Sequence, residues 1–138
     1  MLGVALGPRD TNSALASYEA LRERADIIEL RLDLMDGYDL KTLVTKRPLP
    51  LVVTNRPVRE GGRYEGDETR RVAVLLQALD LGAEYIDIEL DAVQLVPESY
   101  RHRVVVSHHD FERMPPDLDR THQDLAASGM GTMKIVGM

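Results

Sequence analysis

The 138-residue sequence contains no cysteine, no tryptophan and a single phenylalanine. Without cysteine the chain can form no disulfide bond, no thiolate metal site and no thiol nucleophile. No apolar run approaches the ~20 residues of a membrane-spanning helix, and the N-terminal segment does not have the pattern of a secretory signal peptide. We therefore expect a cytoplasmic protein that has no membrane partner.

Basic side chains are outnumbered by acidic ones. The chain has 17 basic and 23 acidic side chains and a formal net charge of −6, which argues against binding to a nucleic-acid backbone. Several arginines are interspersed with acids and are expected to be solvated surface charges: Arg9, Arg59, Arg63, Arg70 and Arg71. Only three residues are lysines, so each can be considered individually: Lys41, Lys46 and Lys134.

Short apolar runs alternate with helical patterns along the chain. The runs rich in Val, Ile and Leu predict six strands: Leu2–Leu6, Ile27–Leu34, Leu51–Asn55, Tyr85–Leu90, Val104–Ser107 and Thr132–Val136. The spacing of apolar residues predicts four helices: Thr11–Arg24, Asp39–Lys46, Asp67–Leu81 and Pro116–Ser128. The first helix is expected to have its cap at Thr11, Asn12 or Ser13. Gly82 and Gly129 are expected to end the third and fourth helices.

Five of the predicted strands carry polar side chains at alternate positions, which is unusual in a parallel sheet that is covered on both faces. Alternation places the members of each set on one face of a strand: Glu29, Arg31 and Asp33; Thr54 and Arg56; Tyr85, Asp87 and Glu89; Ser107 and His109; and Thr132 and Lys134. Five consecutive strands cannot all be solvated edges. A barrel accounts for the pattern, because the apolar face of each strand meets the helices while the polar face points into a shared interior.

Strands separated by helices predict βα units on one parallel sheet. A doubly wound open sheet and a (β/α)8 barrel both fit this order, but the glycine fingerprint of dinucleotide-binding sheets and the P-loop are absent. We therefore predict an α/β fold of the (β/α)8 TIM-barrel family. A whole barrel takes ~250 residues, so residues 1–138 are expected to form one incomplete barrel domain of six βα units, truncated after the sixth strand.

Charged groups inside a barrel are costly unless they are paired, so function explains such a set better than stability does. A buried Lys134 near Arg31 and Arg56 is disfavoured as an ammonium ion by desolvation and by like charge, and its neutral amine can attack a carbonyl carbon. The alternative for Lys134 is a structural ion pair with Glu29 or Asp33.

A histidine and a carboxylate complete this chemistry. Histidine transfers protons near neutral pH, so His109 is the candidate acid and base, and Glu60 in the loop after the third strand is placed to orient it. Adjacent strand residues point to opposite faces, so His108 and His109 are poorly placed to share a metal ion. We therefore predict Schiff-base chemistry on a carbonyl compound, at a site without a metal.

Several motifs together resemble the type I 3-dehydroquinate dehydratase family of the shikimate pathway. They follow the order and spacing of the family through the whole chain: ELRLD (29–33), TNR (54–56), EGG (60–62), YIDIE (85–89), VSHHDF (106–111) and KIV (134–136). The resemblance implies a (β/α)8 barrel, usually a homodimer, that needs no metal or organic cofactor. It also implies the conversion of a small-molecule substrate, 3-dehydroquinate, to 3-dehydroshikimate.

The resemblance also implies a role for each site residue. Lys134 is similar to the lysine that forms an imine with the C3 ketone of the substrate. His109 is similar to the general base that takes the C2 proton and then acts as an acid for the departing C1 hydroxyl. Glu60 is similar to the carboxylate that positions this histidine. The remaining residues are implied to bind substrate (Glu29, Arg31 and Arg56) or to support the site (Asp33 and Asp87).

In the family, the last two strands and their loops supply an arginine that binds the substrate carboxylate, together with a serine and a glutamine of a lid. These residues have no counterpart in the chain. Two other interpretations therefore stand beside the dehydratase. One is a non-catalytic truncated barrel that acts as an assembly module or as part of a longer polypeptide. The other is a different Schiff-base lyase or aldolase on the same fold.

Overall fold

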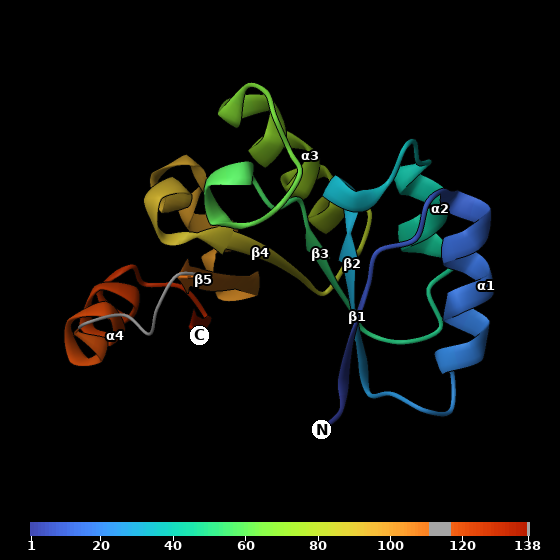
Figure 1. The fold of residues 1–138 in the computed structure, drawn as a ribbon, viewed down its shortest axis with the longest axis horizontal. Helices are drawn as coiled ribbons and strands as arrows, with labels where there is room; N and C mark the ends of the chain where they lie inside the picture. Colours follow the sequence, from blue (N-terminus) through green and yellow to red (C-terminus); the bar gives the residue numbers. More distant parts are fainter. Residues whose placement is uncertain (111–116, 138) are drawn as a thin grey trace.

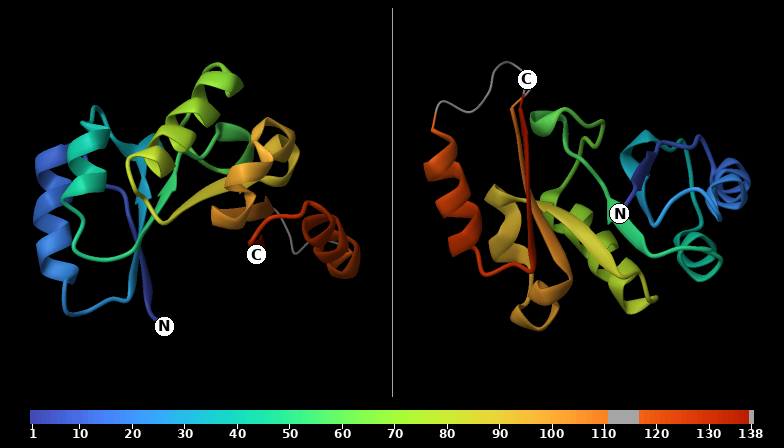
Figure 2. Two further views of the ribbon diagram at one scale, coloured as in Figure 1. Left: turned by 180° about the vertical axis from the view of Figure 1, so that it is seen from behind. Right: turned by 90° about the horizontal axis from the view of Figure 1, so that it is seen from below.

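The computed structural model describes residues 1–110 and 117–137 as a curved parallel sheet with helices along it (Figure 1). Six strands follow one another in the sheet in the order of the chain: β1 (Gly3–Leu6), β2 (Ile27–Arg31), β3 (Leu51–Thr54), β4 (Tyr85–Glu89), β5 (Val104–Asp110) and β6 (Thr132–Gly137). Four α-helices lie on the outer side of the curve, as Figure 2 shows: α1 (Thr11–Leu21), α2 (Leu40–Thr45), α3 (Glu68–Asp80) and α4 (Leu118–Ala127). The predicted arc of a βα barrel is confirmed.

The sheet face that meets the helices is apolar and buried. Its register pairs Ile28 with Leu51 and Ile86 with Val104, and none of these four side chains is accessible to solvent. They pack in one core with side chains from the first three helices: Tyr18, Leu43, Val72, Leu75 and Leu79. Removal of this apolar surface from water supplies most of the hydrophobic stabilisation. The charged side chains Asp87, Glu89 and Lys134 lie on the opposite, inner face of the sheet.

An aspartate precedes each α-helix and caps its first turn. In every case its carboxylate accepts a hydrogen bond from the backbone amide three residues later: Asp10, Asp39, Asp67 and Asp117. Each bond satisfies one of the amide donors that the first turn leaves unpaired. The predicted cap at Thr11, Asn12 or Ser13 is wrong, because the carboxylate of Asp10 accepts a 2.8 Å hydrogen bond from the amide of Ser13, and the helix begins at Thr11 directly after this cap.

Glycine ends two of the helices, as predicted. Gly82 and Gly129 follow α3 and α4 at φ angles of 108° and 72°, a backbone region that glycine adopts at little cost. The predicted start of the last helix at Pro116 lies outside the described residues, and α4 begins at Leu118. None of the helices in the described ranges is long and apolar enough to cross a membrane.

Two strands end three residues away from their predicted ends, and the other four differ from the prediction by one residue. The second strand is shorter than predicted, because Leu32–Leu34 form a 3-10 turn closed by a backbone hydrogen bond, and Asp33 therefore leaves the strand. The fifth strand is longer and continues to Asp110. Two 3-10 helices, Leu90–Leu95 and Glu98–Arg103, connect β4 to β5.

An ion cluster ties the loop after β3 to the start of α3. Glu68 lies 3.0 Å from Arg59 and 2.5 Å from Arg71, and Arg59 also pairs with Asp91 at 2.7 Å. Hydrogen bonds from the guanidinium group of Arg71 lower the pKa of Glu68 to about 2, against the opposing effect of burial. The prediction that Arg71 is a solvated surface charge is wrong, because its side chain is fully buried between the helix and the sheet.

Truncation of Leu75 to alanine is expected to lower the free energy of unfolding by about 2 to 5 kcal/mol, because it removes a fully buried side chain from the core. Leu76→Ala is the matched control, since it makes the same change in the same helix at a side chain that is only partly buried. Urea unfolding followed by circular dichroism measures both. Equal losses would contradict the packing face assigned to α3.

Replacement of Glu68 with glutamine is expected to lower stability near neutral pH by no more than about 1 kcal/mol, because the carboxylate is partly solvated. The pKa of Glu68 is about 2 in the folded protein and 4.5 ordinarily. The stabilisation that its carboxylate provides is therefore complete above pH 4.5 and is lost as the pH falls towards 2. Urea unfolding across this acidic range should show the wild-type and variant free energies converging in acid. A difference that stays constant with pH would contradict the electrostatic explanation.

Candidate active site

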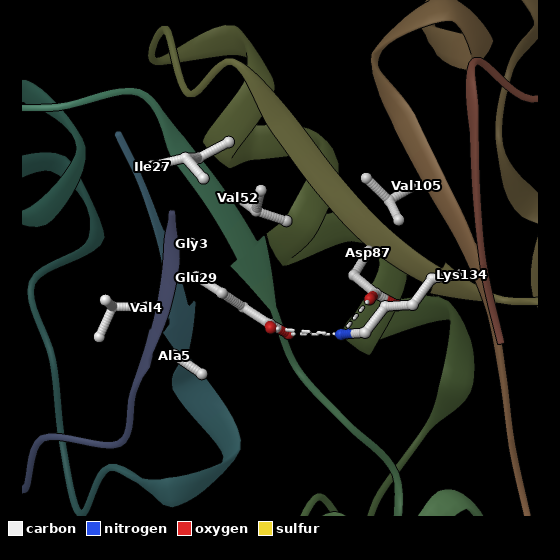
Figure 3. Close-up of a pocket in the computed structure, with 9 residues that line it drawn as sticks. All are labelled: Gly3, Val4, Ala5, Ile27, Glu29, Val52, Asp87, Val105 and Lys134. Atoms are coloured by element: carbon white, nitrogen blue, oxygen red, sulfur yellow. Dashed lines mark hydrogen bonds and ion pairs between the residues drawn. The ribbon is translucent and has the colours of Figure 1, made fainter. Parts of the chain in front are cut away.

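Lys134 of β6 points into a cavity on the inner face of the sheet (Figure 3). Its Nζ atom lies 3.2 Å from a carboxylate oxygen of Glu29 on β2 and 3.5 Å from Asp87 on β4. The cavity has a volume of about 260 Å³ and is otherwise lined mainly by apolar side chains. Lys134 and Glu29 are 105 residues apart in the sequence, so the curvature of the sheet is what brings them together.

The ion pairs recorded for Lys134 are with carboxylates. The ion pair with Glu29, predicted as the alternative, is present. Arg31 and Arg56, the cations predicted near Lys134, have carboxylate partners of their own, and Arg56 shares Asp87 with Lys134. Arg31 pairs with Asp33 at 2.7 Å, and Arg56 turns towards the acids of β4. The charged groups in contact with Lys134 are therefore anionic.

The guanidinium group of Arg56 lies at the centre of this polar network and is almost completely buried. It lies 2.9 Å from Asp87 and 2.7 Å from Glu89, and it donates a 2.7 Å hydrogen bond to Ser107. Burial acts to lower the pKa of Arg56, but the two carboxylates outweigh it and raise that pKa. Burial raises the pKa of the Glu89 carboxyl, although nearby arginines oppose the rise. One cation thus joins β3, β4 and β5.

Asp33 holds Arg31 and the loop after β3 in place. Its carboxylate accepts two hydrogen bonds from Arg31, at 2.8 and 2.7 Å, and one from each of the backbone amides of Arg56 and Arg63, both at 3.1 Å. Burial acts to raise the pKa of Asp33, but these hydrogen bonds outweigh it and lower that pKa. The supporting role of Asp33 in the site stays a prediction.

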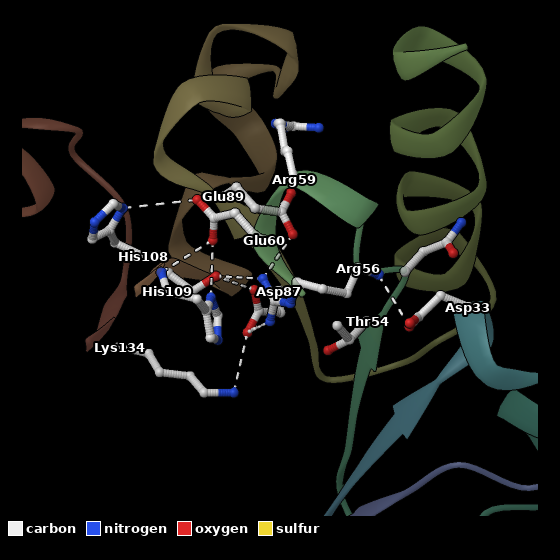
Figure 4. A network of polar contacts seen from close by, with 12 residues as sticks. Asp33, Thr54, Arg56, Arg59, Glu60, Asp87, Glu89, His108, His109 and Lys134 are labelled. Atoms are coloured by element: carbon white, nitrogen blue, oxygen red, sulfur yellow. Dashed lines mark hydrogen bonds and ion pairs between the residues drawn. The ribbon is translucent and has the colours of Figure 1, made fainter. Parts of the chain in front are cut away.

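Glu60 ends the 3-10 turn Val58–Glu60, which Gly61 closes at a φ angle of 75°. One carboxylate oxygen lies 2.9 Å from His109 Nδ1 and accepts a 3.2 Å hydrogen bond from the backbone amide of His109 (Figure 4). Because an ionised carboxylate only accepts hydrogen bonds, this contact with an ionised Glu60 selects the ring tautomer that has its proton on Nδ1. Glu60 and His109 are therefore in the contact that was predicted from the sequence.

His108 is also close to Glu60. Strand alternation did not predict this contact, because it places His108 on the face opposite His109. The two imidazole rings point in different directions (Figure 4), yet His108 Nδ1 lies 3.8 Å from the second oxygen of Glu60, because the Val58–Glu60 turn contacts β5. Across residues 1–110 and 117–137, no group of three or more His, Asp or Glu side chains is placed to hold a metal ion. A reaction without a metal stays a prediction.

Four buried polar residues of the network are missing from the predicted set of site residues: Thr54, Glu89, Ser107 and Arg71. Thr54, which donates a 2.8 Å hydrogen bond to Glu29, shares a strand face with Arg56. Glu89 and Ser107 share strand faces with Asp87 and His109, so strand alternation was a signal that indicated them. Arg71 carries no such signal. It lies on α3, and its 2.6 Å contact with Glu89 depends on how that helix packs against the sheet.

Strands β5 and β6 present an imidazole and an amine to the same side of the sheet. The register pairs Ser107 with Lys134 and His109 with Val136, so His109 and Lys134 lie on the inner face, two residues apart along neighbouring strands. An amine forms an imine with a carbonyl compound, and an imidazole beside it transfers protons. The arrangement can therefore support elimination next to an imine carbon.

Comparisons of the sequence point to one family. The family model for type I 3-dehydroquinase matches residues 3–138. A bifunctional 3-dehydroquinate dehydratase/shikimate dehydrogenase of Arabidopsis thaliana is 40% identical over 123 residues, which cover 80% of this chain and 20% of that protein. A 3-dehydroquinate dehydratase of Methanosarcina barkeri is 36% identical over 115 residues, which cover 72% of this chain and 48% of that protein. The chain thus spans about half the length of such a relative, or less.

Solved structures have the same fold. The 3-dehydroquinate dehydratase of Aquifex aeolicus matches with a TM-score of 0.73 at 26% identity, over 99% of this chain and 67% of that one. The type I 3-dehydroquinate dehydratase of Clostridium difficile matches with a TM-score of 0.82 at 22% identity, over 97% of this chain and 62% of that one. The resemblance found in the sequence is confirmed, and the chain belongs to the type I 3-dehydroquinase family.

Proposed function

We propose that this chain supplies the imine-forming part of a 3-dehydroquinate dehydratase, which converts 3-dehydroquinate to 3-dehydroshikimate with loss of water. The observation that carries the proposal is the placement of Lys134 and His109 on one face of neighbouring strands, with Glu60 bonded to the imidazole. The names of the relatives that match most of this chain support the choice of substrate. We expect no metal ion or organic cofactor to take part.

Imine formation begins when the ammonium group of Lys134 gives up a proton, and the carboxylates of Glu29 and Asp87, at 3.2 and 3.5 Å, are the acceptors in contact with it. The neutral amine attacks the C3 carbonyl carbon of the substrate. The neutral imidazole of His109 carries one proton from the attacking nitrogen to the carbonyl oxygen. The carboxylic acid formed at Glu29 or Asp87 returns the second proton, and the oxygen leaves as water. The resulting C=N bond withdraws electrons and makes the adjacent C2 hydrogen more acidic.

Elimination follows at the neighbouring carbon atoms. His109 takes the C2 proton through Nε2, and the electron pair of the broken C–H bond moves towards the iminium group. The C1 hydroxyl then leaves as water after it receives a proton from the same imidazolium, and a C1–C2 double bond forms. Glu60 holds the imidazole in the required tautomer and stabilises its charged form. Hydrolysis of the imine releases the product and Lys134.

The exposed fractions of the predicted substrate-binding residues suggest different tasks. The side chains of Glu29 and Arg31 are 21% and 22% exposed, so they are placed to contact substrate hydroxyls. Arg56 is 3% exposed and shapes the pocket by holding Asp87. Asp33 supports the site by holding Arg31.

We also propose that residues 1–138 form one barrel domain whose open side is covered by further polypeptide. In the described part of the chain, β1 and β6 each pair with a single neighbour, and an unpaired strand edge exposes backbone hydrogen-bonding groups. The arginine that binds the substrate carboxylate and the lid residues come, in this proposal, from the rest of a longer polypeptide or from a second subunit. A cytoplasmic homodimer without nucleic-acid or membrane partners is the proposed setting.

The open sheet edges also favour the second candidate function, a non-catalytic assembly module. A stable folded monomer in light scattering would count against an assembly module that pairs its edges. The reaction of Lys134 with substrate separates the two functions directly.

Incubation of the chain with 3-dehydroquinate and sodium borohydride is expected to add the reduced substrate to Lys134, because borohydride converts the imine to a stable secondary amine. Peptide mass spectrometry locates the adduct. Lys134→Ala should abolish it, whereas Lys41→Ala, which changes an exposed lysine of α2, should leave it unchanged. A wild-type chain without an adduct would contradict the proposed activity. A stronger adduct with another carbonyl compound would favour a different Schiff-base lyase.

His109→Ala is expected to slow adduct formation and dehydration by about 100-fold or more, since it removes the general acid and base. His108→Ala is the matched control at the adjacent residue and should cost less than about tenfold, because its ring lies at the edge of the network. Borohydride quenching at timed intervals measures the adduct, and ultraviolet absorbance measures the conjugated product. Equal effects of the two substitutions would contradict the roles assigned to them.

A further inference from the structure

Arg71 is a buried charged group that the proposed mechanism does not use. Its side chain has no exposed surface, although it begins on a helix on the outer side of the sheet. The guanidinium group contacts three different partners. It lies 2.5 Å from Glu68 and 2.6 Å from Glu89, and it donates a 2.8 Å hydrogen bond to the backbone carbonyl of Asn55.

The contact with Glu89 is the first of four ion pairs that lead from α3 to the imine-forming lysine. Glu89 lies 2.7 Å from Arg56, Arg56 lies 2.9 Å from Asp87, and Asp87 lies 3.5 Å from Lys134. Cations and anions alternate along this chain of side chains, as Figure 4 shows for its inner members. Each carboxylate is shared by two cations, so the position of each group depends on both of its neighbours.

We propose that Arg71 is a positioning residue for Lys134, acting through Glu89, Arg56 and Asp87. Without Arg71, Glu89 has Arg56 as its remaining cation and draws that guanidinium group towards itself. Asp87 then loses part of its interaction with Arg56 and pairs more strongly with Lys134. The amine is held as an ammonium ion and is less available to attack a carbonyl carbon.

Arg71 also acts on Arg56 through the backbone. Its hydrogen bond to the carbonyl of Asn55 fixes the peptide that directly precedes Arg56, where the chain leaves β3. Asn55 is itself buried, so the freed carbonyl would have no water to replace the lost donor. Two independent contacts of Arg71 therefore determine where the Arg56 side chain lies.

The contacts require an arginine and not merely a positive charge. A guanidinium group is planar and carries five N–H donors in a fixed geometry, so it can bind two carboxylates and a carbonyl oxygen at once. The ammonium group of a lysine is more compact and lies on a stem of different length. We therefore expect Arg71→Lys to keep the charge of this position and to lose the positioning of Lys134.

The inference rests on the proposed function, because Lys134 needs positioning only if it attacks a substrate. A test that uses no substrate keeps the two separate. Formaldehyde with cyanoborohydride methylates accessible lysine amines, and peptide mass spectrometry resolves the rate at each of the three lysines. Lys41 and Lys46 are exposed, so they serve as internal references for Lys134.

Arg71→Met and Arg71→Lys are each expected to lower the methylation rate of Lys134, relative to the two reference lysines, by about fivefold. Arg59→Met is the matched control, since Arg59 also pairs with Glu68 but makes no contact with Glu89 among those recorded for the described residues. It should leave the relative rate unchanged. A role of Arg71 in stability alone would lower the melting temperature without altering this ratio.

The double variant Arg71→Met/Glu89→Gln removes the anion that Arg71 neutralises, and it should return the Lys134 rate to within about twofold of wild type. If Arg71→Met does not fold, as judged by circular dichroism, Arg71→Lys carries the test. An unchanged relative rate in a folded Arg71 variant overturns the inference. A wild-type chain that forms no adduct with 3-dehydroquinate overturns the proposed function instead, so the two failures are distinguishable.

Discussion

Each charge on the inner face of the sheet has to be paired, because the interior does not solvate ions, and much of that pairing runs through Arg56. Its guanidinium group binds both acids of β4 and a hydroxyl of β5. Loss of one member of such a buried network leaves the others without a counter-charge, at a cost of about 3 to 5 kcal/mol. The position of Lys134 therefore depends on ion pairs that Lys134 does not itself make.

Strand alternation separates the residues that stabilise the fold from those that form the site. On β4, Ile86 and Ile88 point outward into the core beneath the helices, while Asp87 and Glu89 point inward to the network. A single five-residue strand thus serves both purposes without conflict. The division has one exception, since Arg71 extends from an outer helix to the acids of the inner face and couples the two sides.

Much of the site follows from local rules. A period of two along each strand separates Glu29, Asp87 and Lys134 from the apolar residues, and the apolar face is expected to meet the helices. The motifs around His109 and Glu60 indicate the contact between these two residues. The burial of Arg71 and the contact of His108 with Glu60 were not predicted, because both depend on how separate elements pack. A helical pattern shows which face of α3 is apolar, but it does not show that Arg71 passes between that helix and the sheet.

The sequence by itself determined the order of the βα units, the inward face of the charged side chains and membership of the family. These properties depend on the local geometry of the backbone and on motifs that can be read along the chain. Only the tertiary structure decided which charges meet: Lys134 lies between Glu29 and Asp87, the arginines have their own carboxylates, and Arg71 is buried. Pairing of this kind depends on the curvature of the sheet and the packing of the helices, which join groups as far as 105 residues apart.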